Sequence, residues 1–593
     1  MPRSTDPTCA TSAINWSSCG DSDEFMKRFN RYYLLPALAL LLLGAVLGVQ
    51  LDSYLSDGDT IQQLKKLERA FVIINRQYVD SVASKDVAEE GIRGMLDELD
   101  PHSSYIRPED VRQVRESYQG SFGGIGIVFE VVRDTARVIS PVADGPSERA
   151  GVMGGDRIIQ IKDSTAVGLS SRGIQKRLKG PIGSDVQMTV YRPSLDKEYT
   201  YTLTRDEIPL YSINTSYMVD NQTGYIEIDR FAMTTYDEFK EKMSSLKDQG
   251  MQRLVIDLRD NPGGVMKSAI EIADELLGSG MTILQTRGRQ SGMNNQYRAS
   301  NGGTFEEPPV MVLVNGNSAS ASEIVSGALQ DHDRALIVGQ RTFGKALVQR
   351  QFELTDGSLL QMTVGRYYTP VGRLIQSPYE NSDREDYYSD KFATIRDATF
   401  NLSEYRDSIP DSLSYQTDHG RTVFGGGGIL PDYVVQPDTT SLTRFVAETQ
   451  LDFAFVVDWF PRHEQALRST WADNQEAFMN TYTPDPAVVD SFWTFAEEKG
   501  LELTTSAEGS PSEGRFSTQK ANAAEAFVQT RIKGFLARQL YGSSAMRPIL
   551  NEVDPVFQEA MTLWDDAAQL SSYHASTEPT TTEQDAASVG DGD

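Results

Sequence analysis

The chain has 593 residues, which is too many for one hydrophobic core and predicts three or four domains. Its apolar fraction of 39% is that of a globular protein, but its formal net charge of −28 argues against a nucleic-acid partner, because phosphate binding requires clustered Lys and Arg. Only two cysteines occur, Cys9 and Cys19, and their place before any folded-looking segment excludes a disulfide framework and a cysteine peptidase.

The segment at 26–50 has the pattern of a signal anchor. Basic residues precede an uncharged apolar run at 34–49, and tyrosines at its start are typical of a membrane interface. No small-residue cleavage site follows, which favours an uncleaved anchor over a removed signal peptide. We therefore expect one transmembrane helix, with the rest of the chain exported. Residues 1–25 are polar and patternless, so we expect them to be disordered or to follow from a start codon assigned too far upstream.

Residues 59–118 predict a helical N-terminal region. Apolar residues recur there at intervals of three and four, which predicts one buried helix face. Those positions are Leu64, Leu67, Phe71, Ile74 and Tyr78.

The middle of the chain predicts two different domains. Residues 119–206 alternate strand-like runs with Gly and Asp turns, interrupted by one helix at 170–178, which indicates a compact β-rich module. Residues 207–440 alternate strand and helix patterns and predict an α/β core. Within that core, 376–420 is polar and poor in large aliphatic side chains, so we expect an insertion or a lid.

Residues 441–574 predict a helical C-terminal region, followed by a disordered acidic tail at 575–593. The candidate core residues of the helical region are Trp459, Trp471, Trp493 and Trp564.

The junction after the apolar strand 310–314 is the best candidate for catalytic chemistry. Small residues follow the strand, and a helix then begins, so backbone N–H groups and the helix dipole favour a developing oxyanion. Ser318, Ser320 and Ser322 all lie in this run, and the local pattern leaves open which of them is the nucleophile.

Lys345, in a turn after the next strand, is the candidate general base. A lysine ordinarily has a pKa near about 10.4, but burial lowers it, and a neutral amine can then accept a serine proton. A surface turn lysine is the competing interpretation. The apolar neighbours Phe343, Leu347 and Val348 favour burial.

An ordered series of motifs between about residue 60 and residue 440 resembles the carboxyl-terminal processing peptidases, or tail-specific proteases, of the S41 serine-peptidase family. The motifs are LDPHSSYI (99–106), GSFGGIGI (120–127), GVMGGDRIIQIKD (151–163), LRDNPGG (258–264), SASASEI (318–324), TFGKALVQ (342–349), DGSLLQMTVGRYYTPVGRLIQ (356–376) and GGILPD (427–432). The resemblance implies a multidomain α/β protein with a crotonase- or ClpP-like protease core, an inserted PDZ domain at 119–206 and flanking helical regions.

The resemblance also implies the site residues of a serine endopeptidase. It assigns the nucleophile to Ser320, the general base to Lys345 and the orienting amide to Gln349. It implies a supporting role for Asp331, and no metal or organic cofactor. The oxyanion donors it implies are backbone N–H groups of Gly263 or Gly264 and of Ala321.

The glycine-rich motif resembles the carboxylate-binding loop of PDZ domains. Its expected residues are Gly123, Gly124, Ile125, Gly126 and Ile127. Their N–H groups would hold a terminal carboxylate, while the strand 127–131 pairs with the incoming tail. The implied partners are exported proteins with unstructured apolar C-termini. By the same resemblance, Arg192 is a candidate link that lets the module regulate the core.

Two other functions remain open at this point: a non-catalytic PDZ scaffold or adaptor, and an acyl-transfer enzyme on a crotonase-like core. The presence of Ser320 and Lys345 disfavours the first, and the lack of a basic phosphate cradle disfavours the second. For 441–574 the resemblance suggests a homodimer contact or adaptor binding. We expect a single-pass protein of the inner (cytoplasmic) membrane, with its catalytic domain on the periplasmic side.

Overall fold

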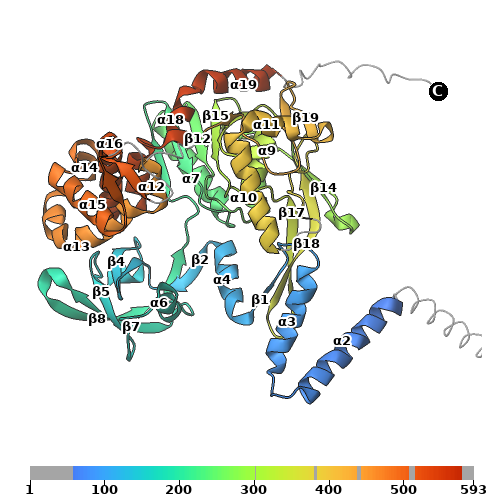
Figure 1. Ribbon diagram of the computed structural model, residues 1–593, viewed down its shortest axis with the longest axis horizontal. Helices are drawn as coiled ribbons and strands as arrows, with labels where there is room; N and C mark the ends of the chain where they lie inside the picture. Colours follow the sequence, from blue (N-terminus) through green and yellow to red (C-terminus); the bar gives the residue numbers. More distant parts are fainter. Residues whose placement is uncertain (1–57, 301, 380–383, 437–441, 506–513, 577–593) are drawn as a thin grey trace, which may run out of the picture. The chain divides into compact units, whose positions relative to one another are not determined.

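The computed structural model describes residues 58–300, 302–379, 384–436, 442–505 and 514–576 (Figure 1). The predicted segments 1–25 and 26–50, and nearly all of 575–593, lie outside the described residues. Within the described ranges, no helix has both the length and the apolar character needed to cross a membrane. The chain divides into two compact units, 1–95 and 96–593.

The first unit contains α2 (Gly58–Gln77) and most of α3 (Ser84–Asp97). The helix that the apolar spacing predicts is present as α2, but the prediction of a buried face was wrong. Leu64, Leu67, Ile74 and Tyr78 are all exposed. A 3.6-residue spacing identifies a face of a helix, but it does not determine which other element covers that face.

The α/β part of the second unit is built on a six-stranded sheet in the order β10-β11-β12-β15-β16-β21. All neighbours are parallel except β10 and β11. The strands are β10 (Thr215–Met218), β11 (Thr223–Glu227), β12 (Arg253–Asp257), β15 (Val310–Val314), β16 (Ala335–Gly339) and β21 (Tyr433–Val434). The central strands β15 and β16 are buried throughout, and β12 is buried after its first residue, as apolar runs in a parallel sheet require when both faces are covered.

The two faces of this sheet are covered by helices from distant parts of the chain. One face packs against α7 (Thr235–Asp248), α8 (Met266–Asp274) and α9 (Ala321–Asp331). The other packs against α18 (Pro555–Thr562) and α19 (Trp564–Ser576), which Figure 1 draws in red beside β12 and β15. Trp564 therefore belongs to the core around this six-stranded sheet. Local sequence patterns did not reveal this, because the helices that cover a sheet face can come from any part of the chain and are determined by long-range contacts.

A second sheet holds the segment that follows the candidate base. Its order is β1-β18-β13-β14, with β17 also paired to β18. The strands are β1 (Ser104–Ile106), β13 (Thr282–Arg287), β14 (Asn295–Arg298), β17 (Leu347–Glu353) and β18 (Leu359–Tyr368). The polar insertion after it contains α10 (Arg384–Phe400), α11 (Leu402–Ser408), β19 (Ser414–Gln416) and β20 (Thr422–Phe424).

The β-rich module follows α4 (Pro108–Gln119). Its sheet has the order β3-β4-β5-β7-β8, with β6 beside β5. The elements are β3 (Ile127–Val132), β4 (Thr135–Pro141), α5 (Pro146–Arg149), β5 (Arg157–Ile161), β6 (Ser164–Thr165), α6 (Ser171–Leu178), β7 (Asp185–Arg192) and β8 (Lys197–Thr204). The chain enters through β2 (Ser121–Gly124) and leaves through β9 (Asp206–Pro209), and these two strands pair with each other.

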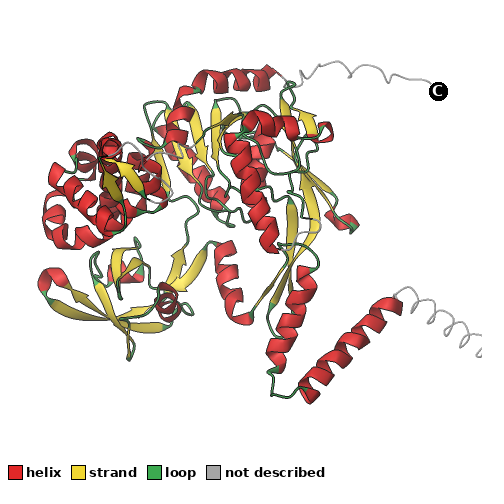
Figure 2. Cartoon of the chain, viewed as in Figure 1, coloured by secondary structure: helices red, strands yellow, loops and turns green. Residues whose placement is uncertain are grey.

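The region from 442 to 551 is mostly helical, as Figure 2 shows. It contains α12 (Leu442–Glu448), α13 (Leu451–Trp471), α14 (Gln475–Thr481), α15 (Pro486–Glu498), the strands β22 (Glu502–Thr504) and β23 (Arg515–Ser517), α16 (Thr518–Tyr541) and α17 (Ser543–Asn551). Trp459 is buried in its core, and Trp471 and Trp493 pack against that core.

Candidate active site

Ser320 occupies a strained backbone position at the start of α9. Its φ of 53° and ψ of −106° are uncommon for a residue with a side chain, and such strain is concentrated at functional sites. Its two neighbouring serines are committed to structure. Ser318 Oγ donates to the Leu258 carbonyl at 2.8 Å, Ser322 Oγ donates to the Asn261 carbonyl at 3.0 Å, and both serines are fully buried. Of the three serines that the pattern left open, only Ser320 is partly exposed.

The buried carboxylate of Glu323 joins the segment of Ser320 to the segment of Lys345. Its Oε2 atom accepts from the backbone N–H of Ser320 and from that of Lys345, both at 2.8 Å. Its Oε1 atom accepts from Thr342 Oγ1 at 2.6 Å and from the Gly344 N–H. Glu323 was not predicted as a site residue. The S-x-x-E spacing of a helix capping box was the available signal.

Tyr367 on β18 makes a second link between the same two segments. Its hydroxyl lies 3.1 Å from the Ser320 carbonyl oxygen and 2.9 Å from that of Lys345. Burial is the main reason that the pKa of Tyr367 is raised, and Glu323 adds to the effect, so the phenol remains protonated. The backbones of Ser320 and Lys345 are therefore held together from two sides.

The Lys345 side chain is partly buried, and its amine is held by Gln349. Burial is the largest influence on the pKa of Lys345 and lowers it, although Asp100 and Glu323 act in the opposite direction. Lys345 Nζ donates to Gln349 Oε1 at 3.2 Å, and Gln349 Nε2 donates to the His102 carbonyl at 2.7 Å. Among the described residues, no hydrogen bond joins the Lys345 amine to the Ser320 hydroxyl.

The glycine loop of LRDNPGG lies directly against Ser320. A Cβ atom added to Gly263 would lie 2.9 Å from the Ser320 Cβ and 2.6 Å from the Ala319 carbonyl oxygen. The φ of Gly263 is 94°, a conformation that a residue with a side chain rarely adopts.

The candidate oxyanion donors differ in the hydrogen bonds that their N–H groups make in this structure. The Gly263 N–H donates to Asn261 Oδ1 at 2.9 Å, so it is already occupied. By contrast, the N–H groups of Gly264 and Ala321 donate no hydrogen bond within the described part of the chain. The sequence pattern could not separate the two glycines, because it does not show where the Asn261 side chain turns.

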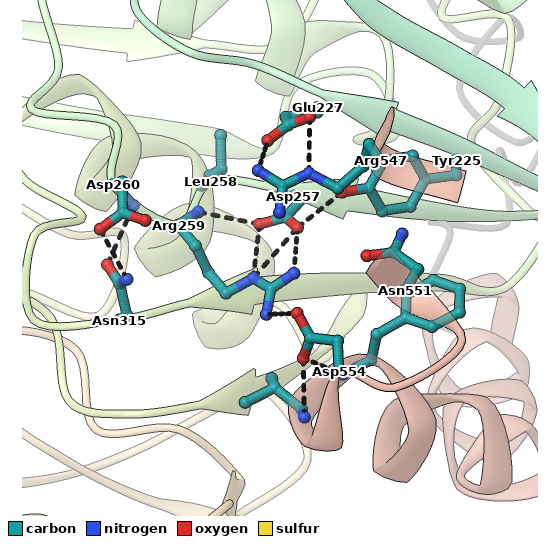
Figure 3. Close-up of polar contacts among 12 residues, drawn as sticks. Tyr225, Glu227, Asp257, Leu258, Arg259, Asp260, Asn315, Arg547, Asn551 and Asp554 are labelled. Atoms are coloured by element: carbon teal, nitrogen blue, oxygen red, sulfur yellow. Dashed lines mark hydrogen bonds and ion pairs between the residues drawn. The ribbon is translucent and has the colours of Figure 1, made fainter. Parts of the chain in front are cut away.

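A charged network lies where β12 ends and this loop begins (Figure 3). Asp257 accepts from the Arg259 guanidinium and from the Tyr225 hydroxyl at 2.7 Å. Burial by itself raises the pKa of Asp257, but Arg259 outweighs it and the pKa is lowered. Arg259 Nη1 also donates to Asp554 Oδ2 at 2.7 Å, and Arg547 pairs with Glu227. The C-terminal helices therefore contact the strand ends that carry the loop.

Asp331 is not in contact with the candidate nucleophile or base. It is fully buried, it pairs with Arg373, and its Oδ2 accepts from the Val371 N–H at 3.0 Å. His332, the next residue, contacts Asp418 Oδ2 at 2.6 Å and the Thr282 carbonyl at 2.7 Å. Neither residue has a contact with Ser320 among these bonds.

The predicted tail-binding loop divides into two parts. Gly123 and Gly124 belong to β2, which pairs with β9, so this half is part of a two-stranded connection. Ile125, Gly126 and Ile127 form the turn into β3, where Gly126 has a φ of 68°. Strand β3 lies at an edge of its sheet, which leaves one side open for an added strand.

Arg192 does not provide the predicted link to the core in this structure. Its guanidinium donates two hydrogen bonds of 2.7 Å to Asp156 and one of 2.9 Å to the Gly151 carbonyl. These partners belong to the module itself. A buried charge needs such pairing close by, and Asp156 provides it.

Among the described residues, no group of three or more His, Cys, Asp or Glu side chains is arranged so that it could hold a metal ion.

Comparison with known proteins identifies the family. Residues 222–383 match Peptidase family S41, residues 123–203 match the PDZ domain, and residues 49–110 match the Activating protease CtpB N-terminal domain. The Carboxy-terminal-processing protease of Bartonella bacilliformis is 36% identical over 325 residues, which are 54% of this chain and 74% of that protein. The Carboxyl-terminal-processing protease of Picosynechococcus sp. is 39% identical over 295 residues, which are 49% of this chain and 70% of that protein.

A solved structure, the photosystem II D1 C-terminal processing protease, aligns with a TM-score of 0.32 at 24% identity and covers 63% of this chain and 92% of its own. The chain belongs to peptidase family S41. It is a multidomain α/β serine peptidase, a carboxy-terminal-processing protease with a substrate-binding PDZ domain and helical regions. This membership decides against the acyl-transfer enzyme and the non-catalytic scaffold.

Proposed function

We propose that Ser320 is the nucleophile of this peptidase, that Lys345 is its general base and that Gln349 orients the Lys345 amine. The protease core is then of the crotonase- or ClpP-like type. One observation carries the assignment: a single Glu323 oxygen and a single Tyr367 hydroxyl each contact the backbones of both segments. Two residues that are far apart in sequence are thereby fixed next to each other.

The chemistry follows from these positions. The neutral Lys345 amine accepts the proton of Ser320 Oγ, and Oγ attacks the carbonyl carbon of the scissile peptide bond. The N–H groups of Gly264 and Ala321 stabilise the oxyanion. The Lys345 ammonium then protonates the leaving amine as the C–N bond breaks. Water, deprotonated by Lys345, hydrolyses the acyl-enzyme and restores Ser320.

This reaction requires a small movement of the lysine side chain. In the absence of substrate its amine is bonded to Gln349, and catalytic hydrogen bonds often tighten only in the substrate complex. Desolvation supports the role, since it is the main influence that lowers the pKa of Lys345 and so favours the neutral form.

The module at 123–203 supplies tail specificity in this proposal. The N–H groups of Ile125, Gly126 and Ile127 would bind the terminal carboxylate of an unstructured protein, and β3 would pair with its last residues. Cleavage then falls near the C-terminus. Arg192 would act by holding the module together around Asp156.

The segment at 26–50 supports a further proposal on location. Its basic flank and apolar run favour a single-pass anchor in the inner membrane, with the peptidase on the periplasmic side. Membrane fractionation, followed by protease accessibility of the catalytic domain in spheroplasts, tests this. Recovery of the full chain in the soluble cytoplasmic fraction would contradict it.

The catalytic assignment is tested with purified Ser320→Ala and Lys345→Ala proteins. We expect each to lose at least about 10³-fold in kcat/KM on an unfolded protein substrate. Lys267→Ala, which alters an exposed lysine, serves as the matched control. Binding of a peptide with a free apolar C-terminus should persist in Ser320→Ala and disappear when the peptide is amidated. Full proteolysis by either active-site variant would refute the assignment.

A further inference from the structure

A small cavity lies beside the segment that leads into Lys345. Its volume is about 90 Å³, roughly the share of three liquid water molecules. It is lined from two sides, by the loop that precedes the candidate base and by α10 of the insertion. Its lining residues include Arg341, Phe343, Ser377, Tyr387, Lys391 and Gly427.

Arg341 brings a buried positive charge that is not neutralised by a partner. It is 5% exposed, and its Nη1 atom is buried without a hydrogen bond in the described chain. Its guanidinium carbon lies 4.8 Å from the centre of the Tyr405 ring. A Cβ atom added to Gly427 would lie 1.6 Å from Arg341 Nη2, so this glycine is what allows the guanidinium to occupy its place.

Lys391 brings a second buried positive group to the same cavity. It is also 5% exposed, and its amine donates to Ser377 Oγ and to Tyr387 Oη, both at 3.0 Å, and to the Gly344 carbonyl oxygen at a longer 3.4 Å. The amine lies 3.8 Å from the centre of the Phe343 ring. Burial lowers the pKa of Lys391 to about 7, Arg341 and Lys345 add to that effect, and Glu323 opposes it.

The carboxylates nearby do not balance these two groups. Glu323 already accepts from four backbone and hydroxyl donors, and neither Arg341 nor Lys391 forms an ion pair with any described residue. Asp390 lines the cavity but is exposed. Burying an unpaired cation costs several kcal/mol, roughly, so such a pair is expected where an anion provides the compensation.

We propose that this cavity is a binding site for a small oxyanion, held by the Arg341 guanidinium, the Lys391 amine and the Ser377 hydroxyl. A planar guanidinium suits an oxyanion with two acceptor oxygens, and an ammonium group adds a third contact. Because Phe343, two residues before Lys345, and Lys391 of α10 both line the cavity, the bound ion would hold α10 against the loop of the candidate base. The site is independent of the catalytic roles proposed above.

The full chain, titrated with sulfate at constant ionic strength set by chloride, provides the test. We expect a saturable rise in thermal unfolding temperature and a matching calorimetric isotherm. Phosphate should give the same saturable rise in unfolding temperature. A parallel titration with acetate shows whether a carboxylate also binds to the site. Arg341→Gln and Lys391→Gln should each weaken sulfate binding at least tenfold. Arg396→Gln, an exposed arginine on the same helix, is the matched control and should bind as the wild type does.

A second measurement on the unaltered protein covers the case in which Arg341→Gln does not fold. An anion beside Lys391 raises its pKa, so sulfate binding near neutral pH should take up protons. Calorimetry in two buffers of different ionisation enthalpy measures this uptake, which should vanish in Lys391→Gln. A response that rises linearly with sulfate, or one that is equal in the wild type, Arg341→Gln and Lys391→Gln, would overturn the proposal.

Discussion

Two buried carboxylates lie near the candidate active site, and they are stabilised in opposite ways. Glu323 accepts hydrogen bonds from four uncharged donors, all within residues 320–345. Asp257 instead faces the Arg259 guanidinium, and Arg259 reaches Asp554, which is 295 residues away. Glu323 fixes the relative position of the candidate nucleophile and the candidate base. The second carboxylate fastens the C-terminal helices to the strand that carries the glycine loop. Uncharged hydrogen-bond donors close in sequence therefore hold the candidate catalytic residues in place. Ion pairs between residues far apart in sequence hold the structure around them in place.

The largest effect is expected from Glu323→Gln. A glutamine keeps the shape but replaces one acceptor oxygen with an NH₂ group, which would face two N–H or O–H donors. Each unsatisfied buried donor costs about 1–3 kcal/mol, so we expect about a 10³-fold loss of kcat/KM and a lower unfolding temperature. Steady-state kinetics and calorimetry measure both. Glu353→Gln, on an exposed pair with Arg115, is the control. Activity within a few-fold of the wild type would show that Glu323 does not position the site.

The second effect concerns the glycine loop between the two carboxylates. In Gly263→Ala the new methyl group would press on Ser320 and the Ala319 carbonyl. Small misplacements of a reacting group cost about 10²-fold in rate, which is the loss of kcat/KM that we expect. Gly280→Ala measures the cost of the backbone strain alone. Gly280 also has a positive φ, of 80°, but a Cβ atom added there would meet no other atom within 4 Å. That variant should lose about 1 kcal/mol of stability and keep its activity. Equal kinetic losses in the two variants would remove the contact argument.

The third prediction uses pH to distinguish the region of Lys345 from the charged network of Asp257, Arg259 and Asp554. Because the ammonium form of Lys345 cannot accept a proton, kcat/KM should fall about tenfold per pH unit below the pKa of Lys345. That pKa is lowered by burial from 10.5, so the midpoint of this acid limb should lie below 10.5. Asp554→Asn, on the remote side, should leave the midpoint unmoved. A rate that does not change between pH 5 and 10 is incompatible with a lysine base.

The smallest effect is expected from Asp554→Asn itself. Asparagine retains the hydrogen bonds that Asp554 accepts from Val556 and Phe557 at the start of α18, but it loses the charge that faces Arg259. Since both side chains are partly exposed, we expect about 1–2 kcal/mol of lost stability and less than a tenfold loss of kcat/KM. A double-mutant cycle with Arg259→Gln measures the coupling between the two side chains. A coupling energy of zero would show that the C-terminal helices do not support the loop electrostatically.

Much of the candidate site could be predicted from local patterns. The strand-to-helix junction at Ser320, the apolar neighbours of Lys345 and the glycine loop are each carried by a few consecutive residues. The S-x-x-E spacing from Ser320 to Glu323 is also a local signal, that of a helix capping box. Local backbone preferences and short hydrogen bonds decide such features, so the sequence contains them directly.

Other features depended on the assembled chain. Asp554, Arg547 and Lys391 lie outside the catalytic motifs, and Arg341 directly precedes one of them. The spacing of these four residues does not distinguish any of them from a surface residue. The occupied N–H group of Gly263 depends on the direction of the Asn261 side chain. The exposure of α2 depends on which elements pack against that helix, and its own residue spacing does not encode this. The sequence by itself determined the family, the order of the elements and the residue types of the site. Only the tertiary structure decided which buried charges meet, because burial and pairing of a charge arise from atoms that the chain brings together when it folds.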